Sequence, residues 1–196
     1  MPKLLSTEQM AEFANSGCLF FEGLIDEDIN REFLNDIGHT NIDEVDNIQN
    51  YFQNIKSSSS IPRIPAGTPL KDAYPLNSPL EKIFKNEIVL GAINSLVGSK
   101  TVVDHQFLHL TFPSKYYEKA NQRQMSQVNH QDSTIDPRTT FDIQLFYFPT
   151  AVTKEMGGTR YIPGTHLRIV NEMGIAKYQN IKGQKNIVCK AGTIGI

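Results

Sequence analysis

The sequence contains few cysteines and no long apolar run. Its 196 residues include only Cys18 and Cys189, which lie far apart and lack the spacing of a CxxC or zinc motif. This usage is typical of a reducing compartment, and the N-terminus shows no signal-peptide pattern, so we expect a cytoplasmic protein. No segment approaches the roughly 20 consecutive apolar residues that cross a bilayer, which excludes a transmembrane helix.

An excess of charge of one sign is also absent. Nineteen Lys and Arg residues against twenty-one Asp and Glu residues give a net charge of -2, which argues against a dominant surface for nucleic acid or anionic lipid. No internal repeat of 20 to 50 residues is present, so solenoids and propellers are excluded. At about 100 to 200 residues per domain, the length predicts a single domain over residues 1–196. Its expected partner is a small molecule, with no nucleic acid and no membrane.

The beginning of the sequence predicts two amphipathic helices. Ser6 is a good N-cap, and Gln9 three residues later completes a capping box, so a helix is expected over residues 7–16. Asp26 is the expected N-cap of a second helix, which ends before Gly38. Both helices carry an apolar face that needs a partner surface.

A third helix follows a long loop. Residues 57–77 are rich in Ser and Pro, which prevents a regular element of any length and predicts a loop. The helix signal after it combines Ser78 as N-cap, Pro79 at the first helical position and Glu81 at the third. Its apolar periodicity predicts one continuous helix to about Leu96.

The second half of the sequence predicts strands. Hydrophobicity changes to period two over residues 101–112, and turn signals recur after that. We therefore expect a helical part over 1–98 and a β core over 99–196, an antiparallel sandwich or barrel onto which the helices pack. Further strands are predicted at 129–133, 140–148, 159–162, 187–189 and 193–196.

The triplet His130-Gln131-Asp132 is the best candidate for chemistry. On a strand, residues i and i+2 point to the same side, so His130 and Asp132 are expected to present an imidazole and a carboxylate to one point. With a remote histidine, such a pair forms the 2-His-1-carboxylate triad of non-haem Fe(II) enzymes. The spacing alone is weak evidence, and a surface or hydrogen-bonded pair is the alternative interpretation.

The order of motifs around the triplet resembles the phytanoyl-CoA dioxygenase family of Fe(II)/2-oxoglutarate oxygenases. The triplet is followed by the apolar strand at 140–148, by the turn KEMGG at 154–158 and by the turn PGTH at 163–166. The opening LSTEQMAEFANSGCLFFEGLIDEDI also looks like the N-terminus of that family. In order, the matches extend from about Leu5 to Ile196.

The resemblance implies a fold, cofactors and site residues. The fold would be mainly β with N-terminal helices, a double-stranded β-helix or jelly roll of the cupin-like kind, with Fe(II), 2-oxoglutarate and O2 at its mouth. His130 and Asp132 would be the catalytic metal ligands, and the carboxylate favours hydroxylation over halogenation. Gln131, Phe107 and Phe146 match positions near the cosubstrate, although ordinary core packing is an equal interpretation of both aromatic residues.

Two expected family residues have no match. The family carries a second His ligand on a late strand and, about ten residues later, an Arg that pairs with 2-oxoglutarate. Residues 190–196 look like the strand that leads up to that His, so we expect a C-terminally truncated jelly roll and a 196-residue chain with little activity.

Other interpretations stay open at this point. The alternative from another class is a non-catalytic jelly-roll module that binds a small molecule without a complete metal triad. A zinc or manganese site of the cupin type would need further clustered His or Glu ligands, which the sequence does not offer. His105 and His109 could edge the pocket but are more commonly sheet histidines, His166 is expected to be structural, and His39 is expected to interact with a helix C-terminus.

Overall fold

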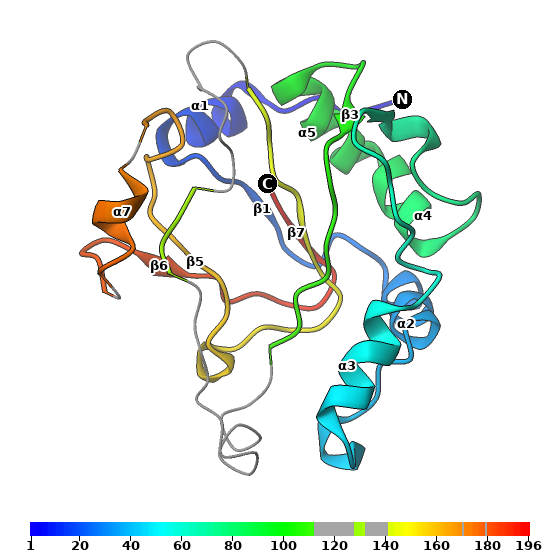
Figure 1. Ribbon diagram of the computed structural model, residues 1–196. Helices are drawn as coiled ribbons and strands as arrows, with labels where there is room; N and C mark the ends of the chain where they lie inside the picture. Colours follow the sequence, from blue (N-terminus) through cyan, green and yellow to red (C-terminus); the bar gives the residue numbers. More distant parts are fainter. Residues whose placement is uncertain (112–127, 132–140, 170, 179) are drawn as a thin grey trace.

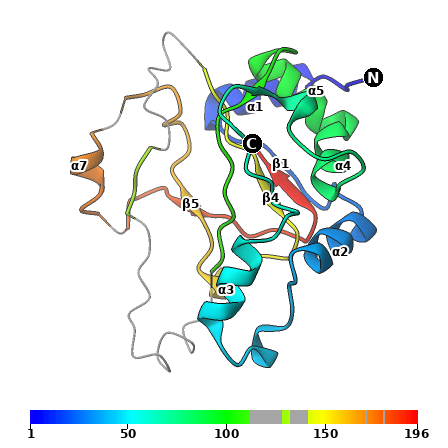
Figure 2. The ribbon, with the colours of Figure 1, turned by 45° about the vertical axis from the view of Figure 1, so that its right-hand side comes forward.

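The computed structural model shows a helical first half and short strands in the second half (Figure 1). Helices α2 (Glu27–Asp36), α4 (Pro79–Lys85) and α5 (Glu87–Val97) lie on one side of the molecule and α7 (Glu172–Ile175) on the other, in both orientations (Figure 2). The described residues form a mixed α/β structure, in which the strands are only two or three residues long and form small antiparallel sheets. The structure describes residues 1–111, 128–131, 141–169, 171–178 and 180–196.

The first two helices begin and end where the sequence predicts. In α1 (Thr7–Ser16), the Ser6 hydroxyl accepts from the Gln9 backbone N–H, and the Gln9 side chain accepts from the Ser6 backbone N–H. This confirms the capping box, which satisfies two N–H groups that a helix start leaves unpaired. Helix α2 (Glu27–Asp36) follows Asp26 as predicted, but no hydrogen bond from a helix N–H to the Asp26 side chain is made.

The third predicted helix is two helices. Helix α4 (Pro79–Lys85) starts at the predicted Ser78 cap, and α5 (Glu87–Val97) follows after a break at Asn86. The Asn86 side chain accepts from the first N–H groups of α5, and its backbone is extended, with ψ at 130°. The expectation of one continuous helix is wrong because the Asn86 side chain competes with the helical hydrogen bonds and starts a new helix.

Between α2 and α4 lies a helix that was not predicted. Helix α3 (Ile48–Lys56) starts at Asn47, whose side chain accepts from the Asn50 N–H. The loop expected after it at 57–77 is also partly ordered, because it contains a short strand that pairs with the chain beyond α5. Two 3-10 turns complete this region, at Ile42–Glu44 and Leu70–Asp72.

The central sheet joins the two ends of the chain. Strand β7 (Thr193–Gly195) lies between β1 (Phe20–Phe21) and β4 (Phe146–Phe148), and both pairings are antiparallel. Pairing of the N-terminal and C-terminal parts brings α1 and the late turns together. Two further antiparallel pairs are β2 (Thr68–Pro69) with β3 (Val102–Val103) and β5 (Arg160–Tyr161) with β6 (Lys185–Asn186).

The strands differ in length from the prediction. The run expected over 101–112 is a strand only at β3, and the run expected over 140–148 is a strand only at β4. The described part of 129–133 is not assigned as a strand, and at 187–189 only an isolated bridge from Cys189 to Val152 forms. The alternation of apolar and polar residues predicts which side chains share a face. It does not reveal which distant segment supplies the backbone hydrogen bonds that make a strand.

The core lies between the helices and the central sheet. Ile83, Val89 and Ile194 have no exposed surface, and they bring α4, α5 and β7 into one apolar cluster. A second cluster around Phe33 and Ile55 joins α2 to α3. Within the described residues, no helix is both long and apolar enough to cross a bilayer.

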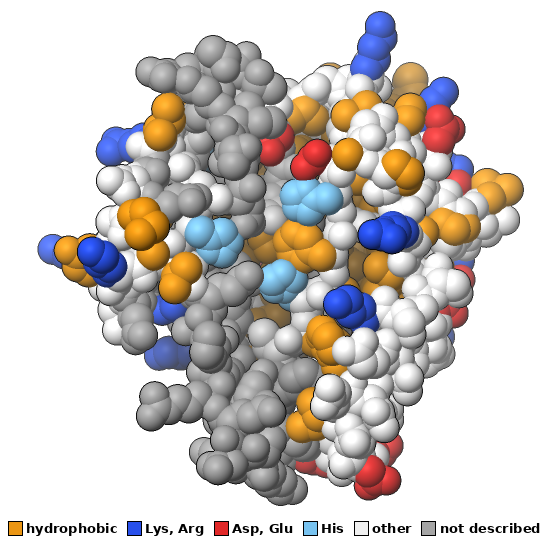
Figure 3. Space-filling view, viewed as in Figure 1, with side chains coloured by type: hydrophobic (Ala, Val, Ile, Leu, Met, Phe, Trp, Pro, Cys, Tyr) orange, Lys and Arg blue, Asp and Glu red, His pale blue; other side chains and the backbone are white. Residues whose placement is uncertain are grey.

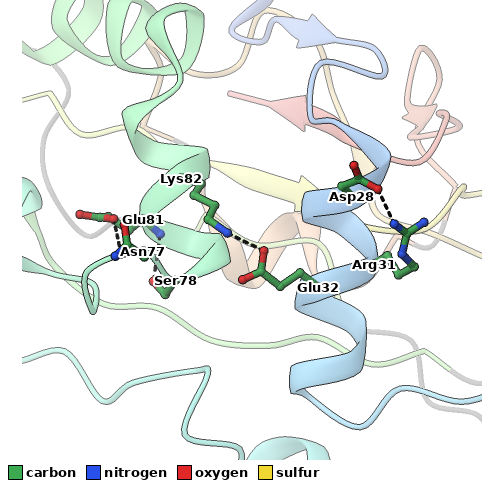
Figure 4. Close-up of polar contacts among 7 residues, drawn as sticks. All are labelled: Asp28, Arg31, Glu32, Asn77, Ser78, Glu81 and Lys82. Atoms are coloured by element: carbon green, nitrogen blue, oxygen red, sulfur yellow. Dashed lines mark hydrogen bonds and ion pairs between the residues drawn. The ribbon is translucent and has the colours of Figure 1, made fainter.

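An ion pair links α2 to α4 at the surface. The Lys82 Nζ lies 2.5 Å from a carboxylate oxygen of Glu32, and the two side chains are 38% and 40% exposed (Figure 4). On the same helices, Asp28 pairs with Arg31, and the Glu81 carboxylate accepts from the Asn77 backbone N–H. Exposed pairs of this kind contribute at most about 1 kcal/mol, so apolar packing fixes the two helices.

Candidate active site

The imidazole of His130 is held in one tautomer. Its Nδ1 lies 2.7 Å from the carbonyl oxygen of Val128. A carbonyl only accepts hydrogen bonds, so Nδ1 carries the proton and the lone pair is on Nε2. Ligating histidines typically donate their other ring N–H to a carbonyl in this way. The exposed His130 side chain thus makes the Nδ1 hydrogen bond that ligating histidines typically make.

The two neighbours of His130 reach a different part of the chain. The Gln131 side chain donates from Nε2 to the carbonyl oxygen of Arg168 at 2.8 Å, and the Asn129 side chain donates from Nδ2 to the carbonyl oxygen of Tyr178. These two amides tie residues 128–131 to the segment 167–178. Asp132, the second expected metal ligand, lies outside the described residues.

Phe107 lies between two histidines on an exposed face. Its ring is 5.5 Å from the His105 ring, stacked at 19°, and 4.6 Å from the His109 ring. Phe107 is 52% exposed, and Nδ1 of His105 pairs with the Asp104 carboxylate at 2.7 Å. Figure 3 shows histidine side chains gathered around apolar surface on this face. The arrangement exposes an aromatic ring between two imidazoles.

The opposite face of the same segment is anchored to the helical part. The Tyr74 hydroxyl donates to Oε1 of Gln106 at 3.0 Å, and its ring stacks on Phe84 at 4.8 Å and 10°. Burial raises the pKa of Tyr74 to about 12, so the hydroxyl stays protonated and donates at any physiological pH. Leu108 and Leu110 pack against the second core cluster, which leaves the odd-numbered residues 105 to 109 outside. The predicted alternation of faces is thus confirmed from residue 105 onward.

Phe146 lies on the central sheet. Its ring stacks on that of Phe148 at 6.1 Å and 8°, since residues i and i+2 of β4 share a face. Across the ladder it pairs with Gly195, whose hydrogen leaves room for aromatic rings. Phe146 is half-buried. Its contacts are those of sheet packing, and they leave its predicted role at the cosubstrate a prediction.

His166 lies against the end of α1. Both ring nitrogens are buried, and neither has a hydrogen-bond partner in the described part of the chain. The ring meets Phe13 edge to face at 5.7 Å. Burial lowers the pKa of His166, and the nearby Ala14 carbonyl opposes this shift only in part. His39 lies just past the end of α2, where its backbone N–H donates to the Leu34 carbonyl at 2.8 Å and its ring contacts the Tyr51 hydroxyl at 2.9 Å.

The described residues do not by themselves form a metal site. Among residues 1–111 and the other described ranges, no cluster of three His, Cys, Asp or Glu side chains is able to hold a metal. The tautomer of His130 nonetheless suits ligation through Nε2. The sequence interpretation named Gln131 but missed Asn129 and the bonds of both amides to distant carbonyls, because no local pattern signals such long-range contacts.

Comparison with known proteins gives one result for the whole chain. The family described as phytanoyl-CoA dioxygenase (PhyH) matches residues 13–194. Neither the curated proteins nor the solved structures include a significant match. The matched range includes the triplet at 130–132, residues 105–109 with Phe107, strands β1 and β4, and the turns at 154–158 and 163–166.

Proposed function

The chain belongs to the phytanoyl-CoA dioxygenase family, and we propose that it is an Fe(II)/2-oxoglutarate-dependent dioxygenase that hydroxylates a small organic substrate. When bound, Fe(II) and 2-oxoglutarate supply O2 activation, with decarboxylation of 2-oxoglutarate to succinate and insertion of oxygen into a C–H bond. The observation that carries the proposal is the tautomer of His130 within a family match over residues 13–194.

His130 and Asp132 are the proposed protein ligands. The i, i+2 spacing supports this pair, because residues two apart on a strand share one side, and the Val128 carbonyl accepts a hydrogen bond from the imidazole. A 2-His-1-carboxylate site leaves open positions for a bidentate cosubstrate and O2. The proposal therefore requires a second histidine for the metal and an arginine for 2-oxoglutarate.

The proposed fold around this site is a double-stranded β-helix. The antiparallel pairs β1–β7–β4 and β5–β6, with the Val152 to Cys189 bridge, supply antiparallel pieces of the kind such a fold contains. Phe107 and Phe146 are proposed to line the cosubstrate pocket. The exposed Phe107 ring supports this role, because a 52% exposed phenylalanine is available to cover a ligand.

A second function is supported by one observation. The described residues contain no cluster of three metal-binding side chains, which favours a jelly-roll module that binds a small molecule without catalysis. The two functions differ in metal binding. A catalytic site binds Fe(II) through His130 and Asp132, whereas the module binds its ligand without either side chain.

The test is anaerobic binding of Fe(II) and 2-oxoglutarate to the full-length protein. Chelation of Fe(II) by a 2-oxo acid gives a visible charge-transfer absorption band that needs no substrate. We expect the band in the unaltered protein and its loss in His130→Ala and Asp132→Ala. His39→Ala is the matched control, because its imidazole is exposed and contacts Tyr51, away from the proposed site. Absence of the band with 2-oxoglutarate in excess contradicts the oxygenase and supports the module.

A further inference from the structure

The imidazole of His166 is a titratable group that takes no part in the proposed reaction. It follows the turn at Pro163 and Gly164 and lies over the end of α1, where its ring meets that of Phe13 edge to face at 5.7 Å. Gly17 lies directly against the imidazole, because a Cβ built at this glycine would overlap the ring. The end of α1 therefore receives the imidazole in a close fit.

A backbone hydrogen bond joins the same turn to the same helix end. The Gly164 N–H donates to the carbonyl of Ser16 at 2.9 Å, and Gly164 has a φ of 77°. The Thr165 hydroxyl donates to the carbonyl of Ile162 at 2.8 Å, which closes the turn on itself. The turn thus docks on α1 as a unit, through Gly164 and the His166 ring.

A positive charge on this ring would be uncompensated. Both ring nitrogens are buried, and neither has a hydrogen-bond partner in the described part of the chain. Burial lowers the pKa of His166 by more than the Ala14 carbonyl raises it. The titratable groups on the elements around the ring are Glu12, Cys18, Asp142, Arg160, Tyr161 and Arg168. None of these described side chains is hydrogen-bonded to the imidazole, so a proton on the docked ring gains no partner.

Release of the ring removes this cost. An imidazole in water has its ordinary pKa of 6.5 and takes up a proton below that value, whereas the docked ring resists the proton. The released state therefore binds more protons than the docked state, and acid shifts the balance toward release. Above about pH 6.5 the ring is neutral in both states, and the dock has its full strength.

We propose that His166 is an acid-sensitive latch: protonation of its ring releases residues 163–168 from the end of α1 while the hydrophobic core stays folded. The core stays folded because its buried members are apolar and do not titrate. The Arg168 carbonyl, two residues beyond the ring, accepts from the Gln131 side chain at 2.8 Å, so release also loosens residues 128–131. The latch is a property of the fold and does not depend on the proposed reaction.

The latch is tested by amide hydrogen exchange of the protein at about pH 7.5 and about pH 5, followed by nuclear magnetic resonance. Rates are expressed as protection factors, which remove the intrinsic effect of pH on exchange. Protection of the Gly164 N–H should fall by up to about 30-fold at the lower pH, because the released imidazole titrates near pH 6.5. Protection of the Ile93 N–H in the buried part of α5 should stay constant, which reports an intact core.

Two variants separate the latch from other effects of acid. His166→Phe keeps an aromatic ring against α1 and cannot take up the proton, so Gly164 should keep the same protection at both pH values. His39→Gln is the matched control, because burial also lowers the pKa of His39, while its ring contacts the Tyr51 hydroxyl of α3. His39→Gln should show the same fall at Gly164 as the unaltered protein.

A second measurement needs no substitution. The imidazole proton resonances of the unaltered protein report the His166 titration directly, and its midpoint should lie below pH 6.5. A midpoint at or above that value overturns the latch. So does constant protection of Gly164 in the unaltered protein, an equal fall in His166→Phe, or an equal fall at Ile93, which would be global unfolding. A fall at Gly164 that His166→Phe removes and His39→Gln retains supports the latch.

Discussion

At Gly17 the backbone turns directly beneath the ring of His166. The residue has φ of 76°, and a Cβ built there would overlap the imidazole. Gly38 has a similar φ of 70° with nothing within 4 Å of its Cβ position. Gly17→Ala should therefore destabilise the fold by more than about 1 kcal/mol, and by more than Gly38→Ala, because only Gly17 adds overlap to strain. Urea unfolding of both variants measures the difference, and equal losses contradict the packing of His166 on α1.

The buried imidazole of His166 also predicts a pH dependence. Burial lowers its pKa below the ordinary 6.5, so the unfolded chain takes up a proton that the folded chain resists. Its contribution to the free energy of unfolding is present above about pH 6.5 and declines as the pH falls below that value. His166→Phe keeps an aromatic ring against Phe13 and removes the titration. The thermal unfolding midpoint should therefore change less between about pH 7.5 and about pH 5 in His166→Phe than in the unaltered protein. The same change in both proteins would show that His166 does not titrate in this range.

At the scale of elements, one hydrogen bond joins α2 to the central sheet. The Tyr147 hydroxyl of β4 donates to Oδ1 of Asn30 at 2.7 Å, and Asn30 is a buried residue of α2. Tyr147→Phe leaves a buried amide oxygen without its partner, which should cost about 1 to 3 kcal/mol of stability. The control Tyr178→Phe changes an exposed residue and should cost less than about 0.5 kcal/mol. Equal stability of the two variants in denaturant titrations contradicts a structural role for the bond.

Elements with local signals were predicted well, and elements that depend on distant partners were not. The capping box at Ser6 acts within three residues, so α1 was predicted to the residue. Asn86 is also a local signal, but the apolar periodicity on both sides concealed the break between α4 and α5. Strand β7 pairs with β1 across almost the whole chain, and no local pattern specifies such a partner.

At the scale of the whole molecule, the site depends on segments far apart in the sequence. Spacing alone predicted that His130 is a ligand candidate, and its tautomer supports that interpretation. The contacts of Gln131 and Asn129 with residues 168 and 178 could not be predicted, because they depend on how the late turns pack on α1. Family membership is shown over residues 13–194, and the ligand set is the proposal that remains to be tested.

The most direct test of the oxygenase proposal is succinate formation from 2-oxoglutarate under air, with Fe(II) and ascorbate. The full-length protein should convert 2-oxoglutarate even without substrate, through slow uncoupled turnover, and His130→Ala and Asp132→Ala should each abolish the conversion. Full activity of His130→Ala or Asp132→Ala, or no conversion by the full-length protein under any substrate tested, would contradict the account.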